Sequence, residues 1–198
     1  AVRLPRAMIR NTTEGTSDMA DIKVLVLLGS LRAASINRQL AELALESAPD
    51  GVAVTIYEGL GELPFYNEDL DTDAAPAAVA ALRAAATAAD AALVVTPEYN
   101  GSIPGVLKNA IDWLSRPFGN GALKDKPLAV IGAALGRYGG VWAHDETRKS
   151  FGIAGPRVVD SVKLSLQTTT FDGRHPRESA EVAAAVRDVV GKLAAEVS

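Results

Sequence analysis

The sequence predicts an α/β fold in which a five-stranded parallel sheet is covered by helices on both faces, a doubly wound sandwich. Apolar, β-branched runs alternate along the chain with stretches of helical spacing, and these runs contain few polar residues. A strand without polar alternation is typical of burial on both faces, which is the environment of a parallel sheet. In such sheets ligands bind beyond the carboxyl ends of the strands, so function is expected in the loops there.

Five strand–helix units are expected in order along the chain. The predicted strands are 22–28 (IKVLVLL), 52–57 (VAVTIY), 91–96 (AALVVT), 127–133 (PLAVIGA) and about 157–166 (RVVDSVKLSL). Helical spacing predicts a helix after each strand, and the second and last are so rich in alanine that intrinsic propensity alone favours helix. The predicted helices are about 35–48, 76–89, 104–115, 141–152 and 177–196.

Residues 1–20 lack this periodicity, and we expect them to be a disordered extension or a cloning remnant before one domain over 21–198. They hold no apolar segment of the kind that a secretory signal requires, and no run approaches the roughly 20 apolar residues that span a bilayer. The chain has no cysteine, which excludes disulfides and a thiolate nucleophile and fits a reducing compartment. Its net charge of −4, without a basic block, disfavours nucleic acid as a partner. We therefore expect a cytoplasmic protein without membrane insertion.

The loop GSLRAASIN gathers hydrogen-bond donors directly after the first buried strand. Gly29 permits a tight turn, and the helix expected from about Ser35 offers free backbone N–H groups and the positive end of its dipole. Ser30 and Asn37 add short side-chain donors, and Arg32 adds the planar fork of N–H groups that suits phosphate oxygens. The loop therefore suits a phosphate, although an ordinary helix cap with a solvated arginine is the alternative.

Other phosphate-binding loops do not match the sequence. It contains neither G-x-x-x-x-G-K-[ST] nor G-x-G-x-x-G. Glu58 ends the second strand where a ribose-binding carboxylate would lie, but one glycine in place of three does not shape the backbone for a pyrophosphate. A receiver domain needs an acceptor aspartate at the end of the third strand, and this strand ends in Val95, Thr96 and Pro97. A single phosphate is the better match.

The loop after the third strand lies in the segment TPEYNGSIPGVLKNAIDWLS. Pro97 ends the strand, residues 98–101 form the loop, and Pro104 with Gly105 begins an amphipathic helix. A tyrosine, an asparagine and a glycine there offer a flat edge, amide hydrogen bonds and close backbone approach. These are the needs of a planar heterocycle rich in donors and acceptors, and a turn packed by Tyr99 is the alternative.

The motifs GSLRAASIN and PEYNGSIPGVLKNAIDW, after the first and third strands, resemble those of the NADPH-dependent FMN reductase family of flavodoxin-like proteins, which includes quinone and chromate reductases. The resemblance covers about residues 22–193 and implies the strand order 2-1-3-4-5. It implies that the first loop holds the FMN phosphate through Ser30, Arg32, Ser35, Ile36 and Asn37. It also implies that the isoalloxazine ring is bordered by Pro97, Glu98, Tyr99, Asn100 and Gly101.

The resemblance extends to a third loop, GAALGRYGGVWAHDETRK, after the fourth strand. In the family a Gly-Gly turn here closes over the flavin or the nicotinamide, and a serine is common where this chain has Ala133 and Ala134. Arg137 suits the extra phosphate of NADPH or a negatively charged acceptor, with a solvated arginine as the alternative. In similar proteins the loop ELPFYNEDL lines the substrate entrance, often across a dimer, and surface aromatic residues that pin a long loop are the alternative. The candidate nicotinamide or substrate residues are Arg137, Tyr138, Gly139, Gly140, Phe65 and Tyr66.

The resemblance implies an NADPH-dependent FMN oxidoreductase, with NADH as an alternative donor, that passes electrons to a quinone, free flavin, chromate or an azo compound. No catalytic side chain is expected, because the chain presents no nucleophile or paired carboxylates and flavin N5 would carry the hydride. His144 and His175 have no second ligand at helical spacing, so no metal is expected.

The resemblance and the apolar stripe of the third predicted helix imply a homodimer or a dimer of dimers. Trp113, on another side of that helix, is expected to meet the partner protomer. The alternative function is a non-enzymatic flavodoxin-type electron carrier or a flavin-regulated interaction module.

Overall fold

Five parallel strands form one sheet in the order β2-β1-β3-β4-β5 in the computed structural model, which describes residues 21–197. The strands are β1 Ile22–Leu28, β2 Val52–Tyr57, β3 Ala91–Val95, β4 Pro127–Ala134 and β5 Arg157–Gln167. The helices are α1 Ile36–Glu46, α2 Ala77–Ala88, α3 Gly105–Leu114, α4 Val141–Ala154 and α5 Ala180–Ala195. The predicted fold and strand order are confirmed, and the expected extension 1–20 lies outside the described residues.

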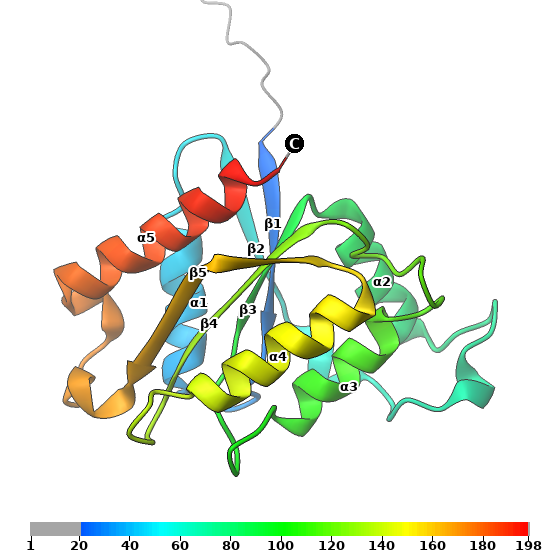
Figure 1. The fold of residues 1–198 in the computed structure, drawn as a ribbon, viewed down its shortest axis with the longest axis horizontal. Coiled ribbons are helices and arrows are strands. Elements are labelled where there is room, and N and C mark those ends of the chain that lie inside the picture. Colours follow the sequence, from blue (N-terminus) through cyan, green and yellow to red (C-terminus); the bar gives the residue numbers. More distant parts are fainter. Residues whose placement is uncertain (1–20, 198) are drawn as a thin grey trace, which may run out of the picture.

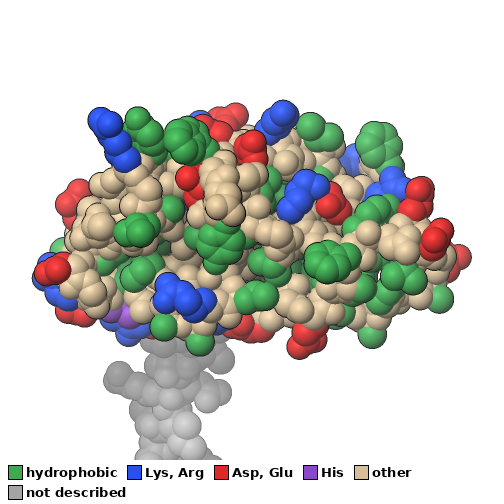
Figure 2. Space-filling view, turned by 90° about the horizontal axis from the view of Figure 1, so that it is seen from below, with side chains coloured by type: hydrophobic (Ala, Val, Ile, Leu, Met, Phe, Trp, Pro, Cys, Tyr) green, Lys and Arg blue, Asp and Glu red, His purple; other side chains and the backbone are tan. Residues whose placement is uncertain are grey.

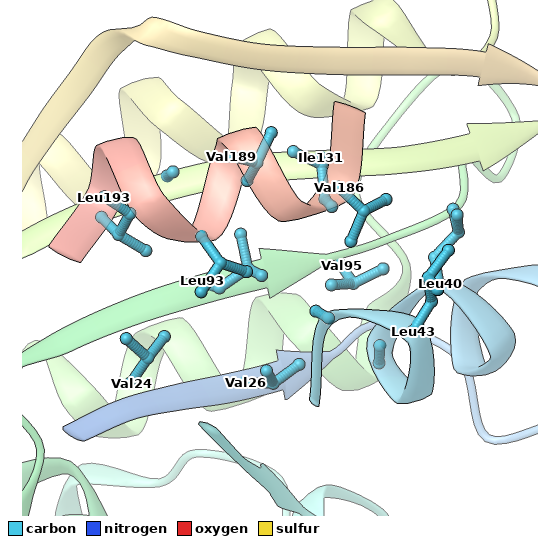
Figure 3. Packing of buried hydrophobic residues seen from close by; sticks show 14 of the residues in the cluster. Val24, Val26, Leu40, Leu43, Leu93, Val95, Ile131, Val186, Val189 and Leu193 are labelled. Atoms are coloured by element: carbon cyan, nitrogen blue, oxygen red, sulfur yellow. The ribbon is translucent and has the colours of Figure 1, made fainter. Parts of the chain in front are cut away.

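Helices cover both faces of the sheet, so the sheet divides the interior into two apolar clusters (Figure 1). Successive residues of a strand point to opposite faces. Val24 and Val26 of β1 therefore pack towards α1 and α5, as Figure 3 shows, whereas Leu25 and Leu27 pack with α2, α3 and α4. No helix within residues 21–197 combines the length and the apolar character needed to span a membrane.

The two outer strands differ from the prediction of burial on both faces. Every residue of β3 and β4 is buried, whereas β2 contains no fully buried residue and only Val159 and Val162 of β5 are buried. The prediction is therefore correct for the central strands and wrong for the edges. An edge strand has a neighbour on one side only, so helices cover it less completely.

Trp113 lies in the core, so the expectation that it meets a partner protomer is wrong. Its side chain is 0% exposed, and its indole N–H donates to the Pro64 carbonyl at 2.8 Å. The Tyr66 ring packs edge-on at 4.9 Å between centroids, and the Arg83 guanidinium lies 5.7 Å from the indole ring. Trp113 thus anchors the loop after β2 to α3.

Two glycines let β1, β3 and β4 approach one another closely at their carboxyl ends. Gly29 does not have the positive φ that a special turn requires, but a Cβ there would lie 2.3 Å from Thr96 Oγ1. A Cβ at Gly132 would lie 2.0 Å from the Thr96 carbonyl oxygen and 2.8 Å from His144 Nε2. Both positions therefore require glycine because of space, and the close contacts converge on Thr96.

We predict that Gly132→Ala destabilises the protein by at least about 1–3 kcal/mol, because the added methyl group must displace the backbone oxygen of Thr96. Urea denaturation followed by circular dichroism measures the change. Gly136→Ala is the matched control, since a Cβ at Gly136 meets nothing within 4 Å and its φ is not positive. Equal stability of the two variants would contradict the close-packing argument.

Candidate functional site

A cavity of about 490 Å³ lies where the carboxyl ends of the central strands meet. Loops after β1, β3, β4 and β5 all contribute to its walls. Of the predicted cofactor residues, those that line it are Ser30, Arg32, Ser35, Ile36, Asn37, Pro97, Glu98 and Tyr99. The fold thus brings together two loops that are more than sixty residues apart in the sequence.

The amino end of α1 presents free hydrogen-bond donors to this cavity. Ser35 caps the helix, and its Oγ accepts the Asn37 N–H at 3.2 Å. The backbone N–H groups of Ile36 and Arg38 have no partner within residues 21–197. Such unpaired N–H groups, together with the helix dipole, favour an anion.

Arg32 supplies a cation at the same place. Its side chain is exposed and forms no ion pair with the carboxylates of residues 21–197. The nearby Arg38 is already engaged, because it makes a bidentate pair with Glu58 at 2.9 and 2.7 Å. That hydrogen bond holds the pKa of Glu58 below its usual range. Glu58 is therefore committed to Arg38, and Arg32 is the arginine available to an anion in the cavity.

Asn37 lines the cavity but has a second task. Its Nδ2 donates to the Ala133 carbonyl at 2.8 Å, and its Oδ1 accepts the Ala133 N–H at 2.8 Å. The pairing of β3 with β4 ends at Ile131. Beyond that point the Asn37 amide, in place of β3, forms hydrogen bonds with the backbone of β4. Asn37 thereby holds α1 against β4, and at most one of its N–H bonds remains for a ligand.

Asn100 and Gly101 form the tip of a tight hairpin. Their φ angles are 52° and 73°, and Tyr99 and Ser102 exchange two backbone hydrogen bonds of 3.1 Å across the turn. Consecutive positive φ values favour an Asn-Gly sequence, which explains these two residues. Neither one is among the cavity-lining residues, and the turn places the half-exposed Tyr99 at the cavity wall.

Glu98 connects the loop after β3 to the start of α4. The residue that precedes this helix, Gly140, has no side chain to cap it, and Glu98 Oε2 accepts the Ala143 N–H at 3.2 Å instead. A carboxylate at the positive end of a helix is stabilised by the helix dipole. The contact fixes the loop that bears Tyr99 relative to α4.

The loop after β4 lies at the cavity rim. Leu135 lines the cavity, whereas the predicted residues Arg137, Tyr138, Gly139 and Gly140 are outside its lining. Arg137 and Tyr138 are exposed, and the Gln167 amide donates to the Arg137 carbonyl at 2.7 Å. The two glycines have φ angles of 62° and 92° and pack against Leu166 and His144.

The structure does not bring Phe65 and Tyr66 into this cavity. Phe65 is 86% exposed, and the Tyr66 ring packs on Trp113 while its backbone N–H donates to Asn109 Oδ1 at 2.8 Å. Within the single chain, both residues belong to the loop that α3 anchors.

His144 is a buried histidine that holds three elements together. Its Nε2 lies 2.9 Å from the Thr96 carbonyl oxygen and its Nδ1 lies 2.7 Å from Ser165 Oγ. A carbonyl oxygen only accepts, so Nε2 carries the proton and Nδ1 accepts from the serine hydroxyl. Burial lowers the pKa of His144, and the Arg148 charge acts in the same direction. The imidazole is therefore neutral and structural.

Six cavity-lining residues are not predicted from the sequence: Ala133, Ala134 and Leu135 after β4, and Thr168, Phe171 and Gly173 after β5. One signal for them existed, since the carboxyl end of every parallel strand reaches the same edge of the sheet. Within residues 21–197, no cluster of three His, Asp or Glu side chains is arranged to hold a metal ion.

Comparisons with known proteins agree with this geometry. Residues 22–170 match the family model described as NADPH-dependent FMN reductase. A quinone reductase of Pseudomonas putida KT2440 is 46% identical over 127 residues, which span 64% of this chain and 68% of that protein. An NAD(P)H-dependent FMN reductase of Pseudomonas aeruginosa is 40% identical over 156 residues, 78% of this chain and 83% of that protein.

A solved structure shares both fold and sequence with the chain. The flavoenzyme NAD(P)H:(acceptor) oxidoreductase FerB of Paracoccus denitrificans superposes with a TM-score of 0.74 at 32% sequence identity. The superposition covers 86% of this chain and 96% of that protein. The similarity therefore extends over the loops that build the cavity as well as the sheet.

We predict that acidification destabilises the protein through His144. Because its pKa is lowered in the folded state, only the unfolded chain gains this proton between the ordinary pKa of about 6.5 and the folded value. The free energy of unfolding should therefore fall below about pH 6.5, by up to about 1.4 kcal/mol per pH unit. Urea titrations at pH 7.5, 6.5 and 5.5 measure this slope.

One variant isolates the contribution of His144 to this slope. His144→Gln should have lower stability at pH 7.5 and a smaller loss between pH 6.5 and 5.5. An identical slope in His144→Gln and the wild type would refute the assignment.

Proposed function

The chain belongs to the NADPH-dependent FMN reductase family, and we propose that the cavity at the α1 terminus is its FMN site, from which electrons pass to a small acceptor such as a quinone. The protein is an NAD(P)H-dependent oxidoreductase that uses FMN. The observation that carries the assignment is the set of donors at the start of α1, beside Arg32, that have no partner within residues 21–197. We propose quinones, free flavin, chromate and azo compounds as candidate acceptors.

The residues present fit FMN. The cavity of about 490 Å³ is in the range of small-molecule sites, roughly 300–1,000 Å³. A terminal phosphate would meet the N–H groups of Ile36 and Arg38, the hydroxyls of Ser30 and Ser35, and the Arg32 guanidinium. These donors serve one phosphate, which favours FMN over the pyrophosphate of a dinucleotide cofactor.

The loop after β3 would orient the isoalloxazine ring. Pro97 is rigid, the hairpin tip at Asn100 and Gly101 sets the position of Tyr99, and Glu98 is tied to α4. Bound FMN supplies the redox chemistry, in which NADPH or NADH delivers a hydride and the acceptor then takes two electrons and two protons. The protein contributes binding and orientation, because its buried histidine is neutral and already engaged by Thr96 and Ser165.

The nicotinamide and the acceptor are proposed to approach over the rim of the same cavity. Arg137, Tyr138, Gly139 and Gly140 remain the candidate contacts there, and Leu135 connects them to the cavity wall. Phe65 and Tyr66 remain candidates only if a second protomer carries them to this rim. The alternative function, a non-enzymatic electron carrier or interaction module, is not supported, because the family and the relatives at 40–46% identity are reductases.

We also propose a homodimer or a dimer of dimers in the cytoplasm. The absence of cysteine fits a reducing compartment. Phe65 and Phe118 are 86% and 81% exposed, so both aromatic rings are available to a second protomer. A second protomer that covers them would form a shared substrate entrance.

We predict that Arg32→Ala weakens FMN binding about tenfold to a hundredfold, since a hydrogen bond to a charged group contributes about 1.5–3 kcal/mol. Titration of the apoprotein with FMN, followed by flavin fluorescence, measures the dissociation constant. Arg187→Ala is the matched control, because Arg187 is an exposed arginine of α5 whose guanidinium donates to the Ser47 carbonyl at 3.0 Å. Unchanged affinity in Arg32→Ala would return Arg32 to the role of a solvated surface charge.

We predict steady oxidation of NADPH with 1,4-benzoquinone and parallel lines in double-reciprocal plots, because donor and acceptor must occupy the same exposed side of the flavin in turn. Stopped-flow absorbance at 450 nm and at 340 nm follows the two half-reactions, with NADH compared under the same conditions. An electron carrier would oxidise no NADPH without a partner protein. Intersecting lines would show instead that donor and acceptor bind together.

We predict a mass of two or four protomers for the pure holoprotein in multi-angle light scattering at micromolar concentration. Phe65→Ser should weaken the assembly if the aromatic side chain is covered by a partner. Leu45→Ser is the control, since Leu45 is an exposed apolar residue on α1. A wild-type mass of one protomer would contradict both the assembly and the shared entrance.

A further inference from the structure

We propose that Arg137, Tyr138 and Trp142 form a binding ledge for a planar aromatic group that carries a negative charge. The proposal rests on the FMN-dependent function above and adds a determinant of substrate choice. Two ligands share this chemistry: the adenosine 2′-phosphate part of NADPH and an anionic aromatic acceptor. The three residues are called the ledge below.

The ledge presents two aromatic faces to solvent. Tyr138 and Trp142 are 53% and 57% exposed, and their ring centroids lie 5.6 Å apart with an interplanar angle of 52°. Figure 2 shows apolar side chains at the surface on the side of the molecule where the strands end. Exposed aromatic rings that already contact each other lose little freedom when a third ring packs against them.

Arg137 gives the ledge its charge preference. Its guanidinium carbon lies 5.5 Å from the centroid of the Tyr138 ring, and the side chain forms no ion pair with the carboxylates of residues 21–197. In a chain with a net charge of −4, an exposed arginine without a carboxylate partner is free to meet an anion. An aromatic anion would use the ring and the charge at once.

The ledge is fixed beside the proposed flavin cavity. The Gln167 amide donates to the Arg137 carbonyl at 2.7 Å. Thr168, which follows Gln167 in the chain, lines the cavity, and so does Leu135. Trp142 lies near the tip of the Tyr99 hairpin, since a Cβ at Gly101 would be 3.6 Å from its Cε3. The Glu98 contact to Ala143 holds the first turn of α4 to the same loop. A ligand on the ledge is therefore next to the cavity mouth.

Binding can be measured without turnover, because the chain has two tryptophans and only Trp142 is exposed. We expect 2′,5′-ADP or 2-naphthalenesulfonate to quench Trp142 fluorescence of the FMN-loaded protein. Arg137→Gln should raise the dissociation constant about tenfold. Trp142→Phe should abolish the signal, and Arg187→Gln should behave as the wild type.

Steady-state kinetics then show whether the anion that binds the ledge belongs to the electron donor or to the acceptor. An Arg137→Gln variant with a KM raised about tenfold for NADPH but not for NADH assigns the ledge to the donor. A kcat/KM lowered about tenfold for 1,4-naphthoquinone-2-sulfonate but not for 1,4-naphthoquinone assigns it to the acceptor. If neither anion quenches Trp142 and neither ratio changes, the ledge proposal is overturned. Failure of the wild type to reduce neutral 1,4-naphthoquinone would instead contradict the proposed function, and the fluorescence arm would still test the ledge.

Discussion

The close contact between the Thr96 carbonyl and Gly132 is the constraint on which the carboxyl edge of the sheet depends. Without a Cβ at Gly132, β3 and β4 approach closely enough for His144 to reach the Thr96 oxygen and for Asn37 to bond both backbone groups of Ala133. Each of these buried polar groups has its partner, and an unpaired one would cost about 1–3 kcal/mol. The network therefore permits one arrangement of α1 and α4 relative to the strands.

This network positions the candidate site through neutral groups. Asn37 places the amino end of α1, whose free N–H groups face the cavity, and His144 links α4 to the ends of β3 and β5. The hydrogen bond between Glu98 and the Ala143 N–H fixes the loop after β3 to the amino end of α4. Hydrogen bonds on the side of the sheet thus hold the loops that surround the cavity. The outer surfaces of these loops remain free to contact ligands.

The strands and the donor-rich loops after β1 and β3 could be predicted from local patterns of the sequence, whereas the strand order followed from the family resemblance. It did not predict that Asn37 is engaged by Ala133, that Gly29 avoids a clash with Thr96, or that Trp113 is buried. Those facts depend on contacts between residues distant in the chain. The wall formed by Thr168 and Phe171 was missed for the same reason, since it follows an edge strand with a mixed pattern.

In a site of this kind, the groups that hold the cofactor differ from the groups that select the substrates. The cavity provides hydrogen-bond donors, one arginine and the carboxylate of Glu98, which caps α4, and the nearby histidine stays neutral because it is buried. None of these groups needs to change its protonation state while a bound flavin reacts, so the chemistry is the cofactor's own. Selection among donors and acceptors must then arise where substrates enter. At that rim we propose that the exposed charge of Arg137, which has no carboxylate partner within residues 21–197, and the adjoining aromatic faces distinguish one small molecule from another.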